Sequence, residues 1–261
     1  MAIISPLYSG SSGNATYIGY GDSGILIDVG VSAKRLKCAL EAAEIKINSI
    51  KAIFITHEHI DHIKGLRVFC KSTHIPVFCS EQTKLAIINH AAIESEQDIT
   101  AFTSEVEISG FKVKRFNTSH DCVGSSGYIV TTPDGKTIGV CTDLGYVSDD
   151  IRKSLIGCDL AMIESNHDIT MLKNGPYPHE LKVRILSDKG HLSNSACAEF
   201  ITELAKSGTT KFILSHISKD NNSPQAAADS VILNMSLCGY ELNVDYTLDV
   251  ASPSSNKITV V

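Results

Sequence analysis

The chain has 261 residues, of which 43% are hydrophobic, and its formal net charge is −6. This length is ample for one large core, so we predict a single domain over residues 1–261. The negative charge argues against non-specific binding to nucleic acid, although a local basic patch could still hold phosphate. Eight cysteines without a CxxC pair suggest neither a zinc ribbon nor a disulfide framework, and buried thiols in a reducing cytosol explain them.

The amino-terminal residues lack a basic leader, and no apolar run is long enough to span a bilayer, so we expect a cytoplasmic protein without a membrane partner. Residues 3–8 read as a strand that leads into Ser-Gly-Ser-Ser-Gly-Asn at residues 9–14. Small residues let backbone amides approach an anion, and the serines add hydroxyl donors. An ordinary hairpin loop is the alternative, since Gly and Ser are common in turns.

Two paired strands and a helix follow, at residues 17–19, 25–28 and 32–44. The second strand ends in Asp28-Val29-Gly30, a strand end that resembles one found in a known hydrolase superfamily named below. This likeness implies that Asp28 holds the adjacent histidine loop rather than binds a metal. The apolar run at residues 52–55 then predicts a short buried strand.

Four potential metal ligands lie directly after that run: His57, His59, Asp61 and His62. On extended backbone the rings of His57 and His59 can converge on one cation. Asp61 and His62, where the chain turns into a predicted helix over residues 63–71, can face a second cation. Such a cluster would be costly to bury without a metal. Imidazole with carboxylate suits zinc, manganese or iron better than calcium or magnesium, so the motif predicts a metal site.

The rest of the chain alternates between predicted strands and helices, with a break at the Gly-Pro-Tyr-Pro sequence of residues 175–178. We predict strands at 77–79, 106–108, 111–116, 127–132, 137–141, 159–164 and 211–216, with two closing strands. We predict helices at 81–89, 148–156, 190–205 and 223–236, and an amphipathic stretch at 180–187. Four of the strands are followed by or end in a polar side chain: His120, Asp143, Glu164 and His216. An N-cap is the alternative role for Asp143, but Ser148 or Asp149 suits that role better.

The HxHxDH sequence after an apolar strand resembles the metallo-β-lactamase superfamily, whose fold is a four-layered αββα sandwich of the α/β class. The resemblance covers nearly the whole chain, since the strand-end residues occur in the family's order. It implies a dinuclear site with a hydroxide between the metals as nucleophile. It assigns to one metal His57, His59 and His120, to the other Asp61, His62 and His216, and to both Asp143.

Three further motifs resemble the YycJ/WalJ branch of that superfamily: SGSSGN at 9–14, ESNHD with GPYP at 164–178, and GHLSN with LSHISKDNN at 190–222. That branch is associated with DNA exonuclease activity and mismatch repair. Glu164 and His191 also match the acidic residue and the histidine of transfer-RNA 3′-processing phosphodiesterases, in which the pair orients a proton donor. A structural role at the strand end is the alternative for Glu164. The short segment between Asp143 and His216 leaves no room for a β-CASP insertion.

The resemblance therefore implies a metallo-hydrolase with two divalent ions (zinc or manganese, or iron) that acts as a 5′→3′ DNA exonuclease, connected with mismatch repair or a cell-wall regulon. Single-stranded or nicked DNA is the expected partner. Asp61, Glu164 and His191 are the expected catalytic residues. Substrate or phosphate would be held by Ser9, Ser11, Ser12, Asn14 and His167, with Lys182 or Arg184. A small-molecule phosphodiesterase, a lactonase-like hydrolase and a non-catalytic metal-binding protein are the alternatives.

Overall fold

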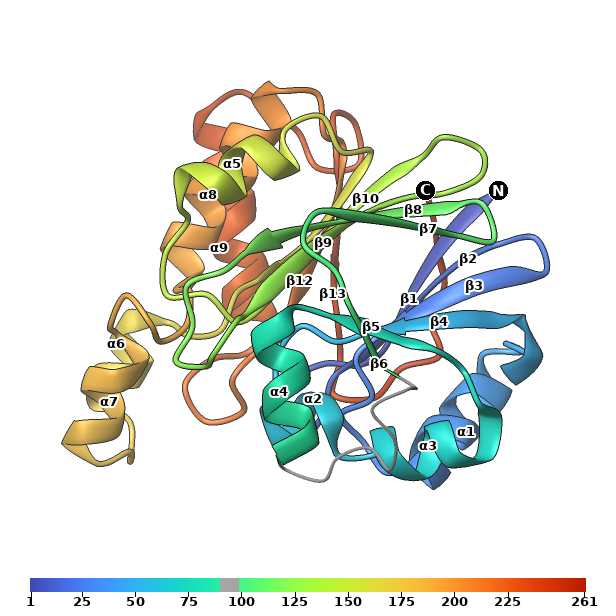
Figure 1. Ribbon diagram of the computed structural model, residues 1–261. Coiled ribbons are helices and arrows are strands. Elements are labelled where there is room, and N and C mark those ends of the chain that lie inside the picture. The colour runs from blue at the N-terminus through green and yellow to red at the C-terminus, as the bar shows by residue number, and fades with distance from the viewer. Residues whose placement is uncertain (90–98) are drawn as a thin grey trace.

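The computed structural model describes residues 1–89 and 99–261. In these residues two seven-stranded sheets pack face to face, and helices cover the outer faces (Figure 1). The first sheet contains, in order across it, β14 (Thr259–Val260), β1 (Ala2–Tyr8), β2 (Ala15–Tyr20), β3 (Ser23–Ile27), β4 (Ile50–Phe54), β5 (Val77–Cys79) and β6 (Ile99–Ala101). The second contains β13 (Thr247–Val250), β12 (Lys211–Ser215), β11 (Leu160–Glu164), β10 (Thr137–Cys141), β9 (Ser126–Thr131), β8 (Phe111–Asn117) and β7 (Glu105–Ile108).

Each sheet is antiparallel on one side and parallel on the other. In the first sheet β3, β4, β5 and β6 run parallel, and in the second β10, β11, β12 and β13 do so. Ligand sites in such sheets lie beyond the carboxyl ends of the parallel strands. The residues that follow β3, β4, β10, β11 and β12 are therefore the ones that the fold can bring together.

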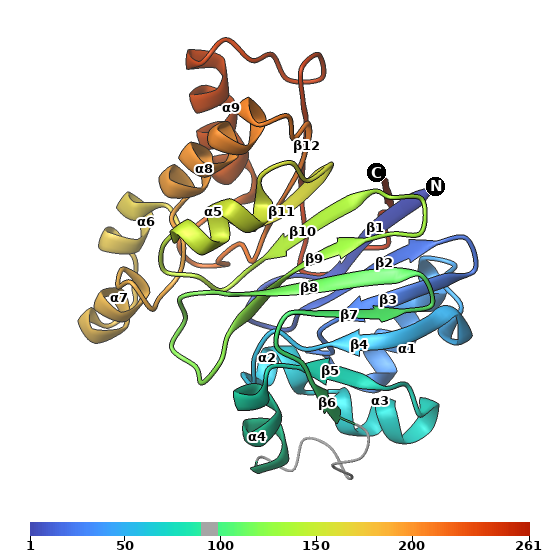
Figure 2. The same ribbon diagram turned by 45° about the horizontal axis from the view of Figure 1, so that its top comes forward.

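Two groups of helices cover the sheets, and a third lies apart from them. The first sheet is accompanied by α1 (Ala33–Ala42), α2 (Ile60–Ile63), α3 (Leu66–Thr73), α4 (Glu81–Asn89) and the 3-10 turn η1 (Ile47–Ser49). The second is covered by α5 (Asp149–Leu155), α8 (Asn194–Lys206) and α9 (Pro224–Leu237). Figure 2 shows α6 (Ile169–Asn174) and α7 (His179–Ile185) projecting to one side. No helix in the described ranges is both long and apolar enough to cross a bilayer.

Three apolar layers hold the sandwich together. Between the sheets, Phe54 of β4 stacks on Phe78 and meets Tyr128 of β9 edge-on. A second layer joins the first sheet to α1 and α3, and a third joins the second sheet to α8 and α9 through side chains such as Phe200 and Val231. Each fully buried side chain of this size contributes about 1.5–3 kcal/mol. The layers confirm the αββα sandwich that the resemblance implied.

The predicted helix over residues 63–71 is wrong in its bounds. The chain forms α2 from Ile60 and then a separate α3 from Leu66. The backbone amide of Gly65 donates to the carbonyl of Val29 instead of to a helical partner, which interrupts the helix. A side chain at Gly65 would also meet the Val31 carbonyl oxygen at 2.0 Å, so the close approach of these two segments needs glycine.

Candidate metal centre

The fold gathers the polar strand-end residues at one edge of both sheets. His57 follows β4, Asp143 follows β10 and His216 follows β12. Asp28, Asp143 and His216 all adopt left-handed backbone conformations, with φ of 64°, 58° and 54°. Such conformations cost on the order of 1 kcal/mol or more outside glycine and concentrate at functional sites. Three of them at adjoining strand ends therefore mark this edge as functional.

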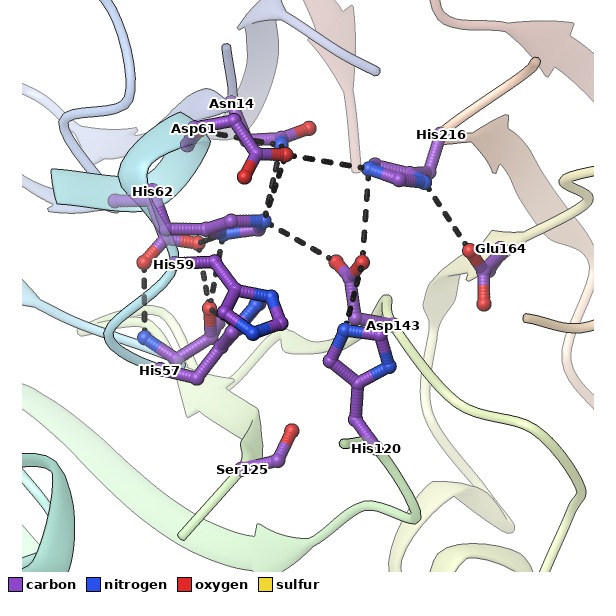
Figure 3. A network of polar contacts seen from close by, with 12 residues as sticks. Asn14, His57, His59, Asp61, His62, His120, Ser125, Asp143, Glu164 and His216 are labelled. Carbon is purple, nitrogen blue, oxygen red and sulfur yellow. Dashed lines mark hydrogen bonds and ion pairs between the residues drawn. The ribbon is translucent and has the colours of Figure 1, made fainter. Parts of the chain in front are cut away.

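The candidate ligands approach one another closely in Figure 3. The ligand atoms of His57, His59 and His120 lie within 4.8 Å of one another, and so do those of Asp61, His62 and His216. These are the two sets that the resemblance assigned to separate ions. The structure thus brings all six side chains into one cluster.

Asp143 lies between the two sets. Its Oδ2 is 3.3 Å from Nε2 of His62, and its Oδ1 is 3.5 Å from Nε2 of His216 and 3.8 Å from Nε2 of His120. Its side chain is almost fully buried. A carboxylate in this position can contact ions on both sides with its two oxygens.

Outer partners turn the histidine rings toward the cluster. The Nδ1 atom of His62 lies 2.7 Å from Asp28, that of His216 lies 3.1 Å from Glu164, and that of His120 lies 3.1 Å from the Gly190 carbonyl. Because acceptors face Nδ1, each ring turns Nε2 toward the cluster. Asp28 also accepts hydrogen bonds from the backbone and hydroxyl of Thr56, so it holds the histidine loop as predicted.

The donor set fits a cation. His57 Nε2, His216 Nε2 and Asp143 Oδ2 are buried and have no hydrogen-bond partner among the described residues, an arrangement that is costly unless an ion completes it. Burial opposes charge on all these groups. Nevertheless, His216 and His62 hold the pKa of Asp143 well below its usual range, and carboxylates raise the pKa of His62 and His216 well above theirs. The cluster attracts positive charge, which a divalent ion can supply in place of protons.

Glu164 and His191 form a pair beside this cluster. Glu164 Oε1 is 2.7 Å from His191 Nδ1, while Oε2 accepts hydrogen bonds from the backbone amides of Leu144 and Leu192 at 3.0 and 3.1 Å. Burial favours the neutral acid, yet His191 lowers the pKa of Glu164 to about 2. Burial likewise opposes charge on His191, but Glu164 raises the pKa of that ring. Glu164 therefore favours the protonated form of the His191 ring, whose side chain lines the cavity described below.

The serine loop, residues 9–14, contains both buried and exposed side chains. Ser9 accepts a hydrogen bond from the His216 amide at 2.8 Å, and Asn14 contacts Asp61 Oδ2 at 3.3 Å and His62 Nε2 at 3.0 Å. Ser11 and Ser12 are exposed. Two of the four predicted phosphate contacts thus support the ligand cluster directly, and two face solvent.

A cavity of about 170 Å³ opens beside the cluster. Its lining includes His120, His191 and His216 of the cluster and its surroundings, together with Tyr177 and Arg184. Ser11 and Ser218 also line the cavity, so it combines hydroxyl groups, a guanidinium and the candidate proton donor.

Like Ser9, Ser12 and Asn14, the predicted substrate residues Lys182 and His167 are not among the residues that line this cavity. Lys182 donates from Nζ to the Lys173 carbonyl at 2.8 Å. His167 is 2% exposed, and burial lowers the pKa of its ring to about 4. In this structure neither side chain faces the space beside the cluster.

The sequence reasoning missed Asp121 and Asn166. Asp121 lies next to His120 and forms an ion pair with Arg184 of α7. Asn166 donates to the His216 carbonyl at 3.0 Å and lines the cavity. Asp121 directly follows the predicted ligand His120, and this adjacency could have marked it as a candidate. Asn166 and His216 are 50 positions apart in the chain, so the sequence did not indicate their contact.

Comparisons with known proteins agree with this architecture. Residues 24–217 match the family model described as a beta-lactamase superfamily domain. The chain is 37% identical over 229 residues to exodeoxyribonuclease YycJ of Bacillus anthracis, covering 87% of this chain and 86% of the relative. It is 33% identical over 253 residues to exodeoxyribonuclease WalJ of Streptococcus pneumoniae serotype 2, covering 95% and 94%.

Among solved structures, the metallo-β-lactamase fold protein YhfI of Bacillus subtilis superposes with a TM-score of 0.72 at 15% identity, over 99% of this chain and 98% of that one. This likeness supports the fold, while the sequence relatives identify the family. The chain is an enzyme that belongs to the metallo-β-lactamase superfamily of hydrolases, and within it to the family of the YycJ and WalJ proteins.

Proposed function

We propose that this protein is a metal-dependent exodeoxyribonuclease that removes nucleotides from the 5′ end of DNA. The observation that carries the proposal is the Glu164–His191 pair, 2.7 Å apart beside the ligand cluster, in which His191 lines the cavity. A protonated imidazole there suits a reaction that expels an alkoxide, as phosphodiester cleavage does. The names of the two sequence relatives support DNA as the substrate class.

Two divalent ions, zinc, manganese or iron, are the proposed cofactors. His57, His59 and His120 would hold one ion, Asp61, His62 and His216 the other, and Asp143 would contact both. When bound, such a pair lowers the pKa of a water molecule and stabilises the oxygens of an in-line displacement. Removing any of these ligands should abolish activity rather than weaken substrate binding.

The chain's own side chains would position and protonate the substrate. Arg184 can hold a phosphate through two parallel hydrogen bonds, and Ser11 can donate a further one. His191 then donates its proton to the leaving oxygen, and Glu164 retains the ring in the required orientation. The stretch between Asp143 and His216 forms α5, β11, α6, α7, α8 and β12, so we propose a single domain without a β-CASP insertion.

Digestion of end-labelled DNA tests the proposal. Single- and double-stranded oligonucleotides labelled at either end are incubated with the protein and manganese, with Asp143→Asn as the control variant. We expect mononucleotides to be released from the 5′ end by the wild-type chain and not by the variant. If none of these DNA substrates is cleaved, the exonuclease proposal is overturned.

A small-molecule phosphodiesterase is the second candidate, favoured by one observation. The cavity is only about 170 Å³ in volume, and Arg184 is the one lysine or arginine among its described lining residues. This lining suits a compact phosphodiester. Hydrolysis of bis-p-nitrophenyl phosphate without any DNA cleavage would favour this candidate.

We place the proposed activity in the cytoplasm and connect it with mismatch repair or a cell-wall regulon. The eight cysteines, all within the described residues, form no disulfide, which fits a reducing compartment. A higher spontaneous mutation rate in cells that carry only the Asp143→Asn variant would support the repair role, and an unchanged rate would contradict it.

A further inference from the structure

Asp121 has an unusual environment for a carboxylate at the rim of a cavity. Its Oδ2 accepts a hydrogen bond from Nε of Arg184. Its Oδ1 is buried and has no hydrogen-bond partner among the described residues. A simple surface ion pair does not explain this second oxygen, because a buried unpaired carboxylate oxygen is costly.

The unpartnered oxygen faces the three-histidine set. Oδ1 lies 3.4 Å from Nε2 of His120 and 3.9 Å from Nε2 of His59. Two ligand atoms bound tetrahedrally about 2.1 Å from one ion are about 3.4 Å apart. Asp121 Oδ1 is thus as close to His120 Nε2 as ligands of one ion are, and closer than the 3.8 Å of Asp143 Oδ1.

We propose that Asp121 supplies an oxygen to the ion held by His57, His59 and His120, with Arg184 of α7 fixing the carboxylate. This inference rests on the metal centre of the proposed function and adds an eighth side chain to it. Carboxylate oxygen is a harder ligand than imidazole nitrogen. A further oxygen ligand therefore shifts the metal preference of this site toward manganese, relative to a site built from histidine alone. The Arg184 contact also links this ion to α7, which supplies Leu181, Arg184 and Ile185 to the lining of the cavity.

Manganese binding tests the assignment. Calorimetric titration and metal analysis are carried out on the wild-type chain, Asp121→Ala, Asp121→Asn and the matched control Asp220→Asn. Asp220 accepts a hydrogen bond at 2.8 Å from Tyr177, which also lines the cavity, so it matches Asp121 as a carboxylate paired with a cavity residue. Circular dichroism confirms that each variant is folded.

We expect the wild-type chain and Asp220→Asn to bind two ions. Asp121→Ala should bind one of them about 10–100-fold more weakly, and Asp121→Asn, which keeps one oxygen, should lose less. In a His59→Ala background, which already disrupts the same ion, Asp121→Ala should cause no further loss.

Two results would overturn the inference. If the wild-type chain binds two ions and Asp121→Ala binds them with the same affinities, the role of Asp121 is overturned and the proposed function is left intact. A wild-type chain that binds no manganese or zinc would overturn both together.

Discussion

Replacing Glu164 with glutamine removes a buried negative charge while keeping the size of the side chain. The Glu164 carboxylate contacts four donors: His191 Nδ1 at 2.7 Å, His216 Nδ1 at 3.1 Å, and the amides of Leu144 and Leu192 at 3.0 and 3.1 Å. Glutamine has one oxygen and one NH₂ group, so at least two of these donors lose their acceptor. At about 1–3 kcal/mol for each unsatisfied donor, we expect a loss of about 2–6 kcal/mol in the free energy of unfolding.

The same substitution should change the pH dependence of cleavage. Glu164 raises the pKa of His191, and the protonated ring is the proposed donor. The wild-type rate should therefore fall as the pH rises through the His191 pKa, and in Glu164→Gln this fall should occur at lower pH. At pH values above the His191 pKa of the variant, Glu164→Gln should cleave about 10²–10⁴-fold more slowly than the wild-type chain.

Urea denaturation of the metal-free chain and pH–rate profiles with manganese measure both effects. Glu203→Gln is the matched control, because Glu203 forms a partly exposed ion pair with Arg152 whose loss should cost less than about 1 kcal/mol. An unfolding free energy in Glu164→Gln within 1 kcal/mol of wild type, with an unchanged pH profile, would refute the reasoning.

Two further predictions concern the support of the site. Asp28→Asn places an amide against His62 Nδ1 and favours the tautomer with the proton on Nε2, so manganese affinity should fall about 10–100-fold in a calorimetric titration; equal affinity would contradict the role of Asp28. The neutral His167 ring has a pKa of about 4 in the folded chain against 6.5 when unfolded, so stability is lost as the pH falls between these values. When the pH falls from 7 to 5, the free energy of unfolding measured with urea should decrease by about 2 kcal/mol less in His167→Asn than in the wild-type chain. Equal decreases would show that His167 is not the acid-sensitive group.

The sequence predicted the fold and the clustering of the candidate ligands because both depend on local patterns. Short apolar runs rich in β-branched residues precede His57, Asp143 and His216, and their length and composition indicate buried strands. The family resemblance then supplied the sheet arrangement and the pairing of ligands with ions. The resemblance also implied the supporting role of Asp28.

Features that depend on distant contacts were not predictable. The break between α2 and α3 arises from the hydrogen bond of Gly65 to Val29, and nothing near Gly65 indicates that partner. Helix α6 was missed because it has only six residues, although Asp168 caps it through the Met171 amide. The Asp121–Arg184 pair joins positions 63 apart, and only the folded chain brings them together.

The exonuclease proposal is tested most directly by comparing the release of mononucleotides from a linear single strand with that from a closed circle of the same sequence. With manganese, we expect steady release from the 5′ end of the linear strand, an intact circle, and no release by Asp143→Asn. Cleavage of the circle, or equal release by the Asp143→Asn variant, would contradict the exonuclease proposal.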